Sequence, residues 1–193
     1  MDAFGDPLHA TSLPQLIAQS NGPLTLVAGN QLDEWLPGLT LPAGWALVGS
    51  GGILTTRMIL RRVGTANFWD GSEILNVYQV PGEVPWDVVV ANADRPLRDS
   101  GATDIYVSQV AELHRRIGVR ATANLDVGPR RLRAQYTYYA VDAAGATALI
   151  EQAIVIGLDV LACLLADVEV LTSSLHRSVL DMPGVAIPPP PPA

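Results

Sequence analysis

Residues 119–168 read VRATANLDVGPRRLRAQYTYYAVDAAGATALIEQAIVIGLDVLACLLADV. Within this stretch, residues 130–141 alternate between two sets of side chains. One set is Leu132, Ala134, Tyr136, Tyr138 and Ala140, and the other is Arg131, Arg133, Gln135, Thr137 and Tyr139. A period of two is typical of a β-strand with one buried face, because successive side chains leave opposite faces of a sheet. We therefore expect a strand with the first set directed inward.

The neighbouring segments extend this pattern into a meander of antiparallel strands. Residues 119–127 also alternate, and Gly128-Pro129 separates them from the strand at 130–141. The resulting hairpin would place Arg131 and Arg133 on the same face as Asp126 and Asn124. Residues 146–156 become apolar on both faces, so this strand needs a layer above and a layer below. Helices or a second subunit could supply these layers, which leaves a homodimer open.

The remaining segments predict short helices and strands that complete a single α+β domain. We expect helices at 12–20, from Pro85 to before Pro96, and at 167–182. The helix that follows Pro85 should direct Trp86, Val89, Val90 and Ala93 inward. Further strands are predicted at 24–28, 44–49, 55–63, 72–80, 105–113 and 159–165. The strand at 105–113 carries apolar residues on both sides, which favours a central position in the sheet.

Length and composition indicate one folded domain with flanking segments. The chain has 193 residues, which is typical of one large domain. We divide it into a lead-in with a short helix at 1–22, an α+β domain at 23–182 and a proline-rich tail at 183–193. The net charge of −7 argues against nucleic-acid binding, because phosphate binding requires a concentrated positive surface.

The sequence also bears on membranes and localisation. The longest apolar stretch, 146–168, contains Glu151, Gln152, Asp159 and Asp167, which argues against a membrane span. The N-terminus lacks the basic and apolar regions of a signal peptide and a cysteine for a lipid anchor. We therefore expect a cytoplasmic protein as the sequence is written, or a cell-envelope protein if its N-terminus is incomplete.

The residues offer little for catalysis or metal binding. Cys163 is the single cysteine, and the three histidines lie far apart without a ligand spacing. No serine lies in a G-x-S-x-G motif. We expect no metal and no other cofactor, and we expect a binding module rather than an enzyme. Cys163 lies between apolar residues and is expected to be buried; an enzyme would need Cys163 or His114 exposed in a polar cleft.

Two groups of residues are candidates for binding. Phe68 and Trp69 lie at a predicted loop tip, and Arg131 and Arg133 belong to an arginine-rich segment of an acidic chain. We interpret these four as a surface for a protein partner, although cross-strand charge pairing would also explain the arginines.

The second group consists of Trp86, Tyr136 and Tyr138. These three side chains either belong to the core or line a pocket between sheet and helix for a small lipid-like ligand. Ligand carriage is therefore the alternative to protein docking.

Several short motifs resemble the actinobacterial LpqN-type proteins. The motifs are Leu-Pro-x-Gly-Trp at 41–45, Asn-Phe-Trp-x-Gly at 67–71 before Val77-Tyr78, Pro-Trp-Asp-x-Val at 85–89, Arg-x-x-Ala-x-Tyr-x-Tyr at 131–138, and Glu-Gln-Ala-Ile-Val-Ile at 151–156. The resemblance covers roughly residues 40–182 and contains no catalytic fingerprint. It implies a twisted antiparallel sheet flanked by helices, an α/β/α sandwich similar to that of the photosystem protein PsbP. It also implies non-enzymatic work at the cell envelope, by docking on proteins or binding a lipid-like ligand.

Overall fold

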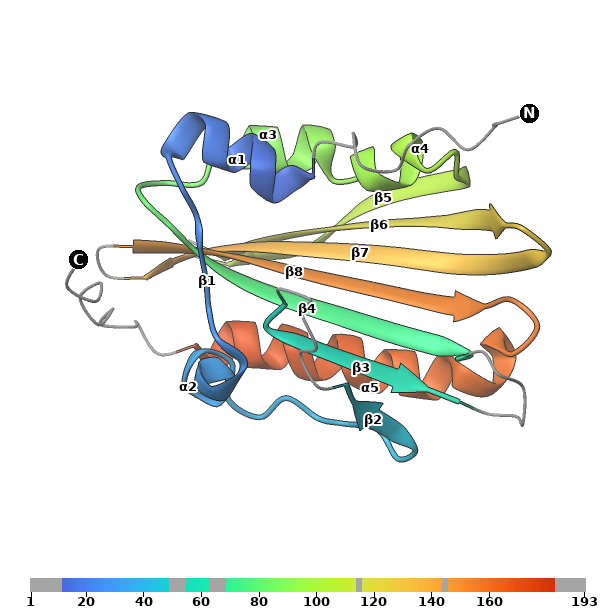
Figure 1. Ribbon diagram of the computed structural model, residues 1–193. Helices are drawn as coiled ribbons and strands as arrows, with labels where there is room; N and C mark the ends of the chain where they lie inside the picture. The colour runs from blue at the N-terminus through green and yellow to red at the C-terminus, as the bar shows by residue number, and fades with distance from the viewer. Residues whose placement is uncertain (1–11, 49–54, 63–68, 114–115, 144–145, 183–193) are drawn as a thin grey trace.

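The computed structural model describes residues 12–48, 55–62, 69–113, 116–143 and 146–182 (Figure 1). The described strands are β1 Thr25–Leu26, β2 Trp45–Leu47, β3 Arg57–Arg61, β4 Gly71–Val80, β5 Thr103–Leu113, β6 Arg116–Val127, β7 Arg130–Ala143 and β8 Ala146–Gly157. The described helices are α1 Leu13–Asn21, the 3-10 turn η2 Gly29–Gln31, α2 Leu32–Trp35, α3 Trp86–Asn92, α4 Arg95–Asp99 and α5 Leu161–Asp181.

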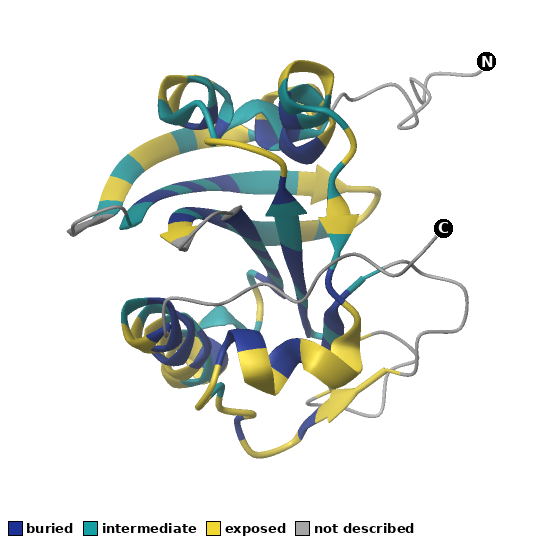
Figure 2. Ribbon diagram, turned by 90° about the vertical axis from the view of Figure 1, so that its left-hand side faces the viewer, coloured by how far each residue is buried: buried dark blue, intermediate teal, exposed yellow. Residues whose placement is uncertain are grey.

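These strands form one open antiparallel sheet with helices on both faces. The strand order is β2-β3-β4-β8-β7-β6-β5, and β1 pairs with β4. Helices α1, α3 and α4 cover one face, which we call the α3 face, and α5 with α2 covers the other, the α5 face (Figure 1). Figure 2 shows buried residues concentrated in the sheet and on the sides of the helices that face it. The predicted α+β class, with an antiparallel sheet flanked by helices, is confirmed.

The predicted meander is present, and its hairpin has the expected register. Strands β6 and β7 pair so that Asp126 is opposite Arg131 and Asn124 is opposite Arg133. Gly128 in the turn has a φ of 57°, a left-handed conformation that glycine adopts without steric cost. Strand β8 lies in the sheet interior between β4 and β7, as its two apolar faces predicted. Helices of the same chain supply the layers above and below it.

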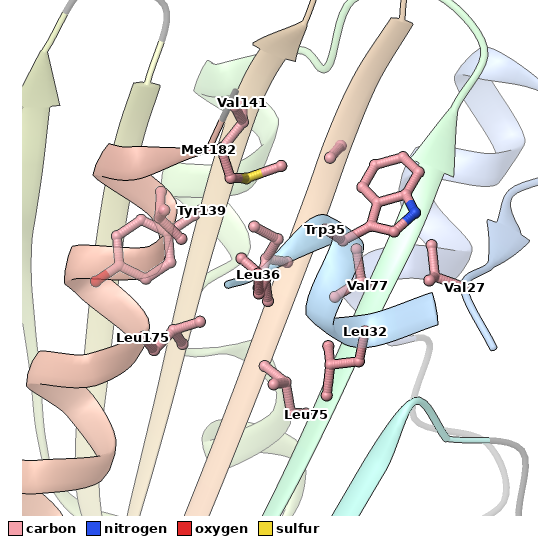
Figure 3. Packing of buried hydrophobic residues seen from close by; sticks show 13 residues of the cluster. Val27, Leu32, Trp35, Leu36, Leu75, Val77, Tyr139, Val141, Leu175 and Met182 are labelled. Atoms are coloured by element: carbon pink, nitrogen blue, oxygen red, sulfur yellow. The ribbon is translucent and has the colours of Figure 1, made fainter. Parts of the chain in front are cut away.

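Strand β7 is buried on both faces near its C-terminal end, so the expectation of one buried face was wrong. Tyr138 lies on the α3 face, whereas Tyr139 lies on the α5 face with only 1% of its surface exposed. Figure 3 shows Tyr139 directed toward α5, beside Leu175. Tyr139 also covers Gly118 of β6, where an added Cβ would lie 2.6 Å from a ring carbon of the tyrosine. The sequence does not reveal that the α5 face of β7 is buried, because tyrosine occurs in both solvent-exposed and buried positions.

Strand β5 lies at the edge of the sheet, so its predicted central position was wrong. Its partner is β6, and among the described residues no strand pairs with its other side. Tyr106 on the α5 face is 66% exposed, because the covering helix does not extend over this part of the sheet. The apolar residues on both faces of β5 therefore predicted a central strand, although β5 is a partly covered edge strand.

Residues 159–165 were predicted as a strand, but most of them form the first turns of α5. Leu161, Leu164 and Val168 follow helical spacing, and Leu164 is buried against the sheet. A short apolar run does not distinguish a strand from a buried helix by periodicity alone. The helical geometry also turns Cys163 outward, so the expectation that this cysteine is buried was wrong.

Helix α3 follows Pro85 and ends before Pro96, as predicted. Val89 and Ala93 are buried, and Trp86 is half-buried against the same cluster. Val90 was expected to face inward but is exposed, because it lies on the outer side of the helix. The chain continues as α4, with Pro96 in its first turn.

Helix α1 begins at a capping box that the sequence predicted in part. Ser12 is the N-cap and accepts a hydrogen bond from the Gln15 N–H, while the Gln15 side chain accepts one from the Ser12 N–H. Ser12→Ala should therefore lower the free energy of unfolding by about 1 kcal/mol. Urea unfolding measures this change, and an equal loss for Ser173→Ala, an exposed hydroxyl on α5, would contradict a capping role.

No helix among the described residues is long and apolar enough to cross a membrane.

Candidate functional site

The first candidate surface lies at the β6–β7 turn, and we call it the hairpin end. It consists of Trp69, Val127, Arg130 and Arg131. Arg130 Nη1 donates a hydrogen bond of 3.1 Å to the backbone carbonyl of Trp69, which joins the turn to the segment before β4. The Leu158 N–H donates to the carbonyl of Arg131, so the β8–α5 connection is attached to the same place. A shallow pocket of about 440 Å³ lies here, lined by Pro129, Arg130, Arg131, Leu158 and Asp159.

The hairpin end exposes both aromatic and cationic groups. Trp69 is 40% exposed, although tryptophan is highly buried on average. Arg131 and Asp126 form the predicted cross-strand pair, with Nε and Oδ1 separated by 3.5 Å and side chains 71% and 74% exposed. Such exposed pairs contribute about 0–1 kcal/mol, so Arg131 remains accessible to another acidic group. Phe68, the remaining aromatic predicted for this surface, lies outside the described residues.

Arg133 lies two residues beyond Arg131 on the same face of β7, but its surroundings differ. It is half-buried, and its guanidinium donates to Asn124 Oδ1 at 3.2 Å and to Thr122 Oγ1 at 2.9 Å. The structure therefore separates the two arginines that were predicted to act together. Arg131 belongs to the hairpin end, and Arg133 belongs to the space between sheet and α5.

The predicted ligand-pocket residues meet on the α3 face. The rings of Tyr136 and Tyr138 are stacked, with centroids 6.4 Å apart and planes inclined by 17°. Trp86 packs against the same cluster, which contains Leu13 and Val89 from the covering helices. The three residues predicted from the sequence to lie near one another therefore belong to one cluster in the fold. Their role in ligand binding stays a prediction.

Sequence reasoning missed a carboxylate beside these tyrosines. Glu151 on β8 is opposite Tyr138 and accepts a hydrogen bond of 3.1 Å from Asn76 Nδ2. Burial raises the pKa of Glu151 above its ordinary value, and the bond from Asn76 offsets part of this rise. Burial, and then the charge of Glu151, raises the pKa of Tyr138 well above its ordinary value. The signal available in the sequence was one acidic residue in an otherwise apolar strand.

The Tyr138 hydroxyl is buried beside the Glu151 carboxylate. Its interaction with Glu151 raises the pKa of Tyr138 and offsets part of the rise in the pKa of the carboxyl, but no atom of the described residues forms a well-aligned hydrogen bond with this hydroxyl. Buried hydroxyls in proteins usually have a partner, so this one marks a place where another polar group could bind.

The raised pKa of Glu151 predicts a pH dependence of stability. The folded state binds this proton more tightly than the unfolded chain does, so the neutral carboxyl favours folding. This contribution is complete below the ordinary pKa of 4.5 and is lost as pH rises through the raised value. Glu151→Gln should therefore stabilise the protein at neutral pH relative to its effect near pH 4.5. Urea unfolding at both pH values tests this prediction, and Asp126→Asn, which removes an exposed carboxylate, is the control. Equal changes in the free energy of unfolding for the two variants at each pH would contradict it.

A second polar group is buried on the α5 face. Arg57 Nη2 and Glu73 Oε2 are 2.6 Å apart, and Gln152 Nε2 donates to Glu73 Oε1 at 2.7 Å. Glu73 is fully buried. A larger pocket of about 490 Å³ includes Arg57 in its lining, together with four leucines, Leu32, Leu39, Leu41 and Leu47. Because Glu73 neutralises Arg57, we assign this ion pair to the stability of the sheet.

Comparison with known proteins gives a structural match. The fold is similar to that of LpqN, described as involved in cell envelope biogenesis of Mycobacterium tuberculosis, with a TM-score of 0.62 and 14% sequence identity. The alignment covers 82% of this chain and 92% of LpqN. No protein-family model and no curated protein matches the sequence. The comparison therefore supports a distant structural relationship with the LpqN fold, which the short motifs had indicated.

Proposed function

We propose that this protein is a non-catalytic docking module of an actinobacterial cell, and that its hairpin end binds a protein partner. The observation that carries the proposal is the half-exposed Trp69, attached through Arg130 to the same turn that presents Arg131. Tryptophan and arginine are the residues that most often dominate the energy of protein interfaces. LpqN is described as acting in cell envelope biogenesis, and we place the function of this chain there as well.

The exposed guanidinium of Arg131 favours an acidic partner segment. Arg131 is bound by one exposed carboxylate at 3.5 Å, a pair that a partner's carboxylate can replace at little cost. The protein as a whole carries a net charge of −7, so the exposed guanidinium of Arg131 favours one orientation of an acidic partner.

Site-specific photo-cross-linking in an actinobacterial host tests this proposal. A photo-reactive amino acid replaces Trp69, and a matched control carries it at Val90, an exposed position on α3. We expect a discrete protein adduct from position 69 only, and we expect Arg131→Glu to reduce its yield by about fivefold or more. Equal adducts from both positions, or a yield that is unchanged in Arg131→Glu, would refute docking at the hairpin end.

A second candidate function is carriage of a small lipid-like ligand on the α3 face. The observation that favours it is the buried Tyr138 hydroxyl, which lies beside Glu151 and forms no well-aligned hydrogen bond with the described residues, next to Tyr136 and Trp86. Native mass spectrometry of protein purified from the same host should then show a retained lipid-sized adduct. Tyr138→Phe should reduce its occupancy, whereas Tyr106→Phe, on the opposite face at the sheet edge, should not. A clean unliganded mass would contradict this second candidate.

A further inference from the structure

A small pocket lies on the α5 face, between the start of α5 and strands β7 and β8. Its volume is about 150 Å³, which is the size of an engineered protein cavity that binds benzene. Its lining includes the polar side chains Arg133 and Gln135 and the apolar side chains Ile154, Leu161 and Leu165. This combination of apolar walls with a few convergent polar groups is typical of small-molecule sites.

The polar lining carries a positive charge without a carboxylate partner. Arg133 forms no ion pair with the described residues, and its guanidinium donates to the neutral oxygens of Asn124 and Thr122. Asn124 in turn donates to the exposed Asp104 at 2.9 Å, so that carboxylate is linked to Arg133 through an intervening amide. Arg131, the neighbouring arginine on this face, is paired with Asp126.

A second donor lies beside this charge. Gln135 is two residues beyond Arg133 on the same face of β7, opposite Ile154, as Arg133 is opposite Ile156. The Gln135 Nε2 atom is buried and has no hydrogen-bond partner among the described residues. A buried donor without an acceptor is unfavourable, so rotation of the Gln135 amide toward an oxygen atom in the pocket would satisfy it.

The apolar lining comes from β8 and from one stripe of α5. Leu161, Leu165 and Val168 follow the spacing that places side chains on one side of a helix, and all three line the pocket. Leu165 is 57% exposed, so this stripe continues to the protein surface and leaves room for entry.

We propose that this pocket binds a small amphipathic carboxylate. The carboxylate accepts hydrogen bonds from Arg133 and Gln135, and an apolar body about the size of benzene packs against Ile154, Leu161 and Leu165. The proposal rests on the described geometry of this pocket and is independent of docking at the hairpin end.

Titration of the full-length protein with benzoate, followed by amide shifts in NMR spectra, tests the proposal. Benzyl alcohol serves as the neutral control and benzylammonium as the cationic control. We expect saturable shifts of the Gln135 side-chain amide and of residues along β7 and α5 with benzoate. Benzyl alcohol should bind about tenfold more weakly. Equal binding of the alcohol, or no shifts with benzoate up to its solubility limit, would overturn the proposal.

Two variants and a matched control locate the site. Arg133→Met should weaken benzoate binding by about tenfold, whereas Arg131→Met removes the same charge two residues away and should leave binding within about twofold. Leu165→Glu places a carboxylate at the exposed mouth without disturbing the core, and should weaken binding by about fivefold or more. If Arg133→Met does not fold, benzoate binding to Leu165→Glu alone tests whether the ligand lies in this pocket. An effect of Arg131→Met as large as that of Arg133→Met, or unchanged binding in Leu165→Glu, would overturn the proposal.

Discussion

Glu73→Ala is expected to lower the free energy of unfolding by about 3–5 kcal/mol. The carboxylate of Glu73 is fully buried, and it accepts hydrogen bonds from both Arg57 and Gln152. Its removal leaves the guanidinium of Arg57 as an uncompensated charge between the sheet and the helices of the α5 face. An unpaired buried charge costs more than the net contribution of the pair, because the desolvation of Arg57 is no longer offset. Urea unfolding monitored by tryptophan fluorescence measures the loss.

Two controls separate this effect from a general sensitivity of the sheet. Asp126→Ala breaks the exposed pair with Arg131 and should change stability by less than about 0.5 kcal/mol. The double variant Arg57→Met/Glu73→Leu removes both charges together and should be within about 1 kcal/mol of the wild type. A double variant as unstable as Glu73→Ala would show that packing, rather than charge, is responsible.

Tyr139→Ala is expected to cost about 3–5 kcal/mol, as large aromatic truncations in protein cores do. Tyr139 is almost fully buried among residues of four strands and α5, and its hydroxyl is 3.2 Å from His176 Nδ1. Tyr139→Phe keeps the ring and removes this hydrogen bond alone, so it should cost about 0.5–1.5 kcal/mol. Chemical denaturation of both variants gives the comparison, and similar losses would assign the effect to the hydroxyl.

The close approach of Tyr139 to Gly118 allows a further check. Gly118→Ala adds a methyl group in van der Waals conflict with the ring and should cost about 1–3 kcal/mol in the wild type. In the Tyr139→Ala background the ring is absent, so the same substitution should cost much less. Additive losses in the double variant would contradict direct packing between these two positions.

The hairpin shows what the sequence predicts well. Alternation on both sides of Gly128-Pro129 predicted the strand ends at the turn, the register and the pairing of Arg131 with Asp126, while each strand extends two or three residues further at its other end. These features depend on local turn chemistry and on a period of two, and both can be read from consecutive residues. The α5 start was missed because its apolar run satisfies strand and helix patterns alike until the tertiary context selects one.

The candidate sites were harder to predict, because their partners lie far apart in the chain. Glu73 pairs with Arg57 across two neighbouring strands, and Gln152 joins them from a third. The exposure of Trp69 and the orphan amide of Gln135 depend on which side chains the helices cover. A single sequence contains no signal for these contacts, since they arise from the packing of elements rather than from local pattern.

The two ends of the strand order have a consequence for association. Strand β2 is three residues long, and the pairing of β5 with β6 shifts register between Thr103 and Tyr106 and again between Gln109 and Ala111. Short or bulged edge strands are poor templates for strand addition by another chain. We therefore expect this protein to resist growth into continuous intermolecular sheets at high concentration. We expect its partners to contact side chains on its surface, and not to add a strand to either edge of the sheet.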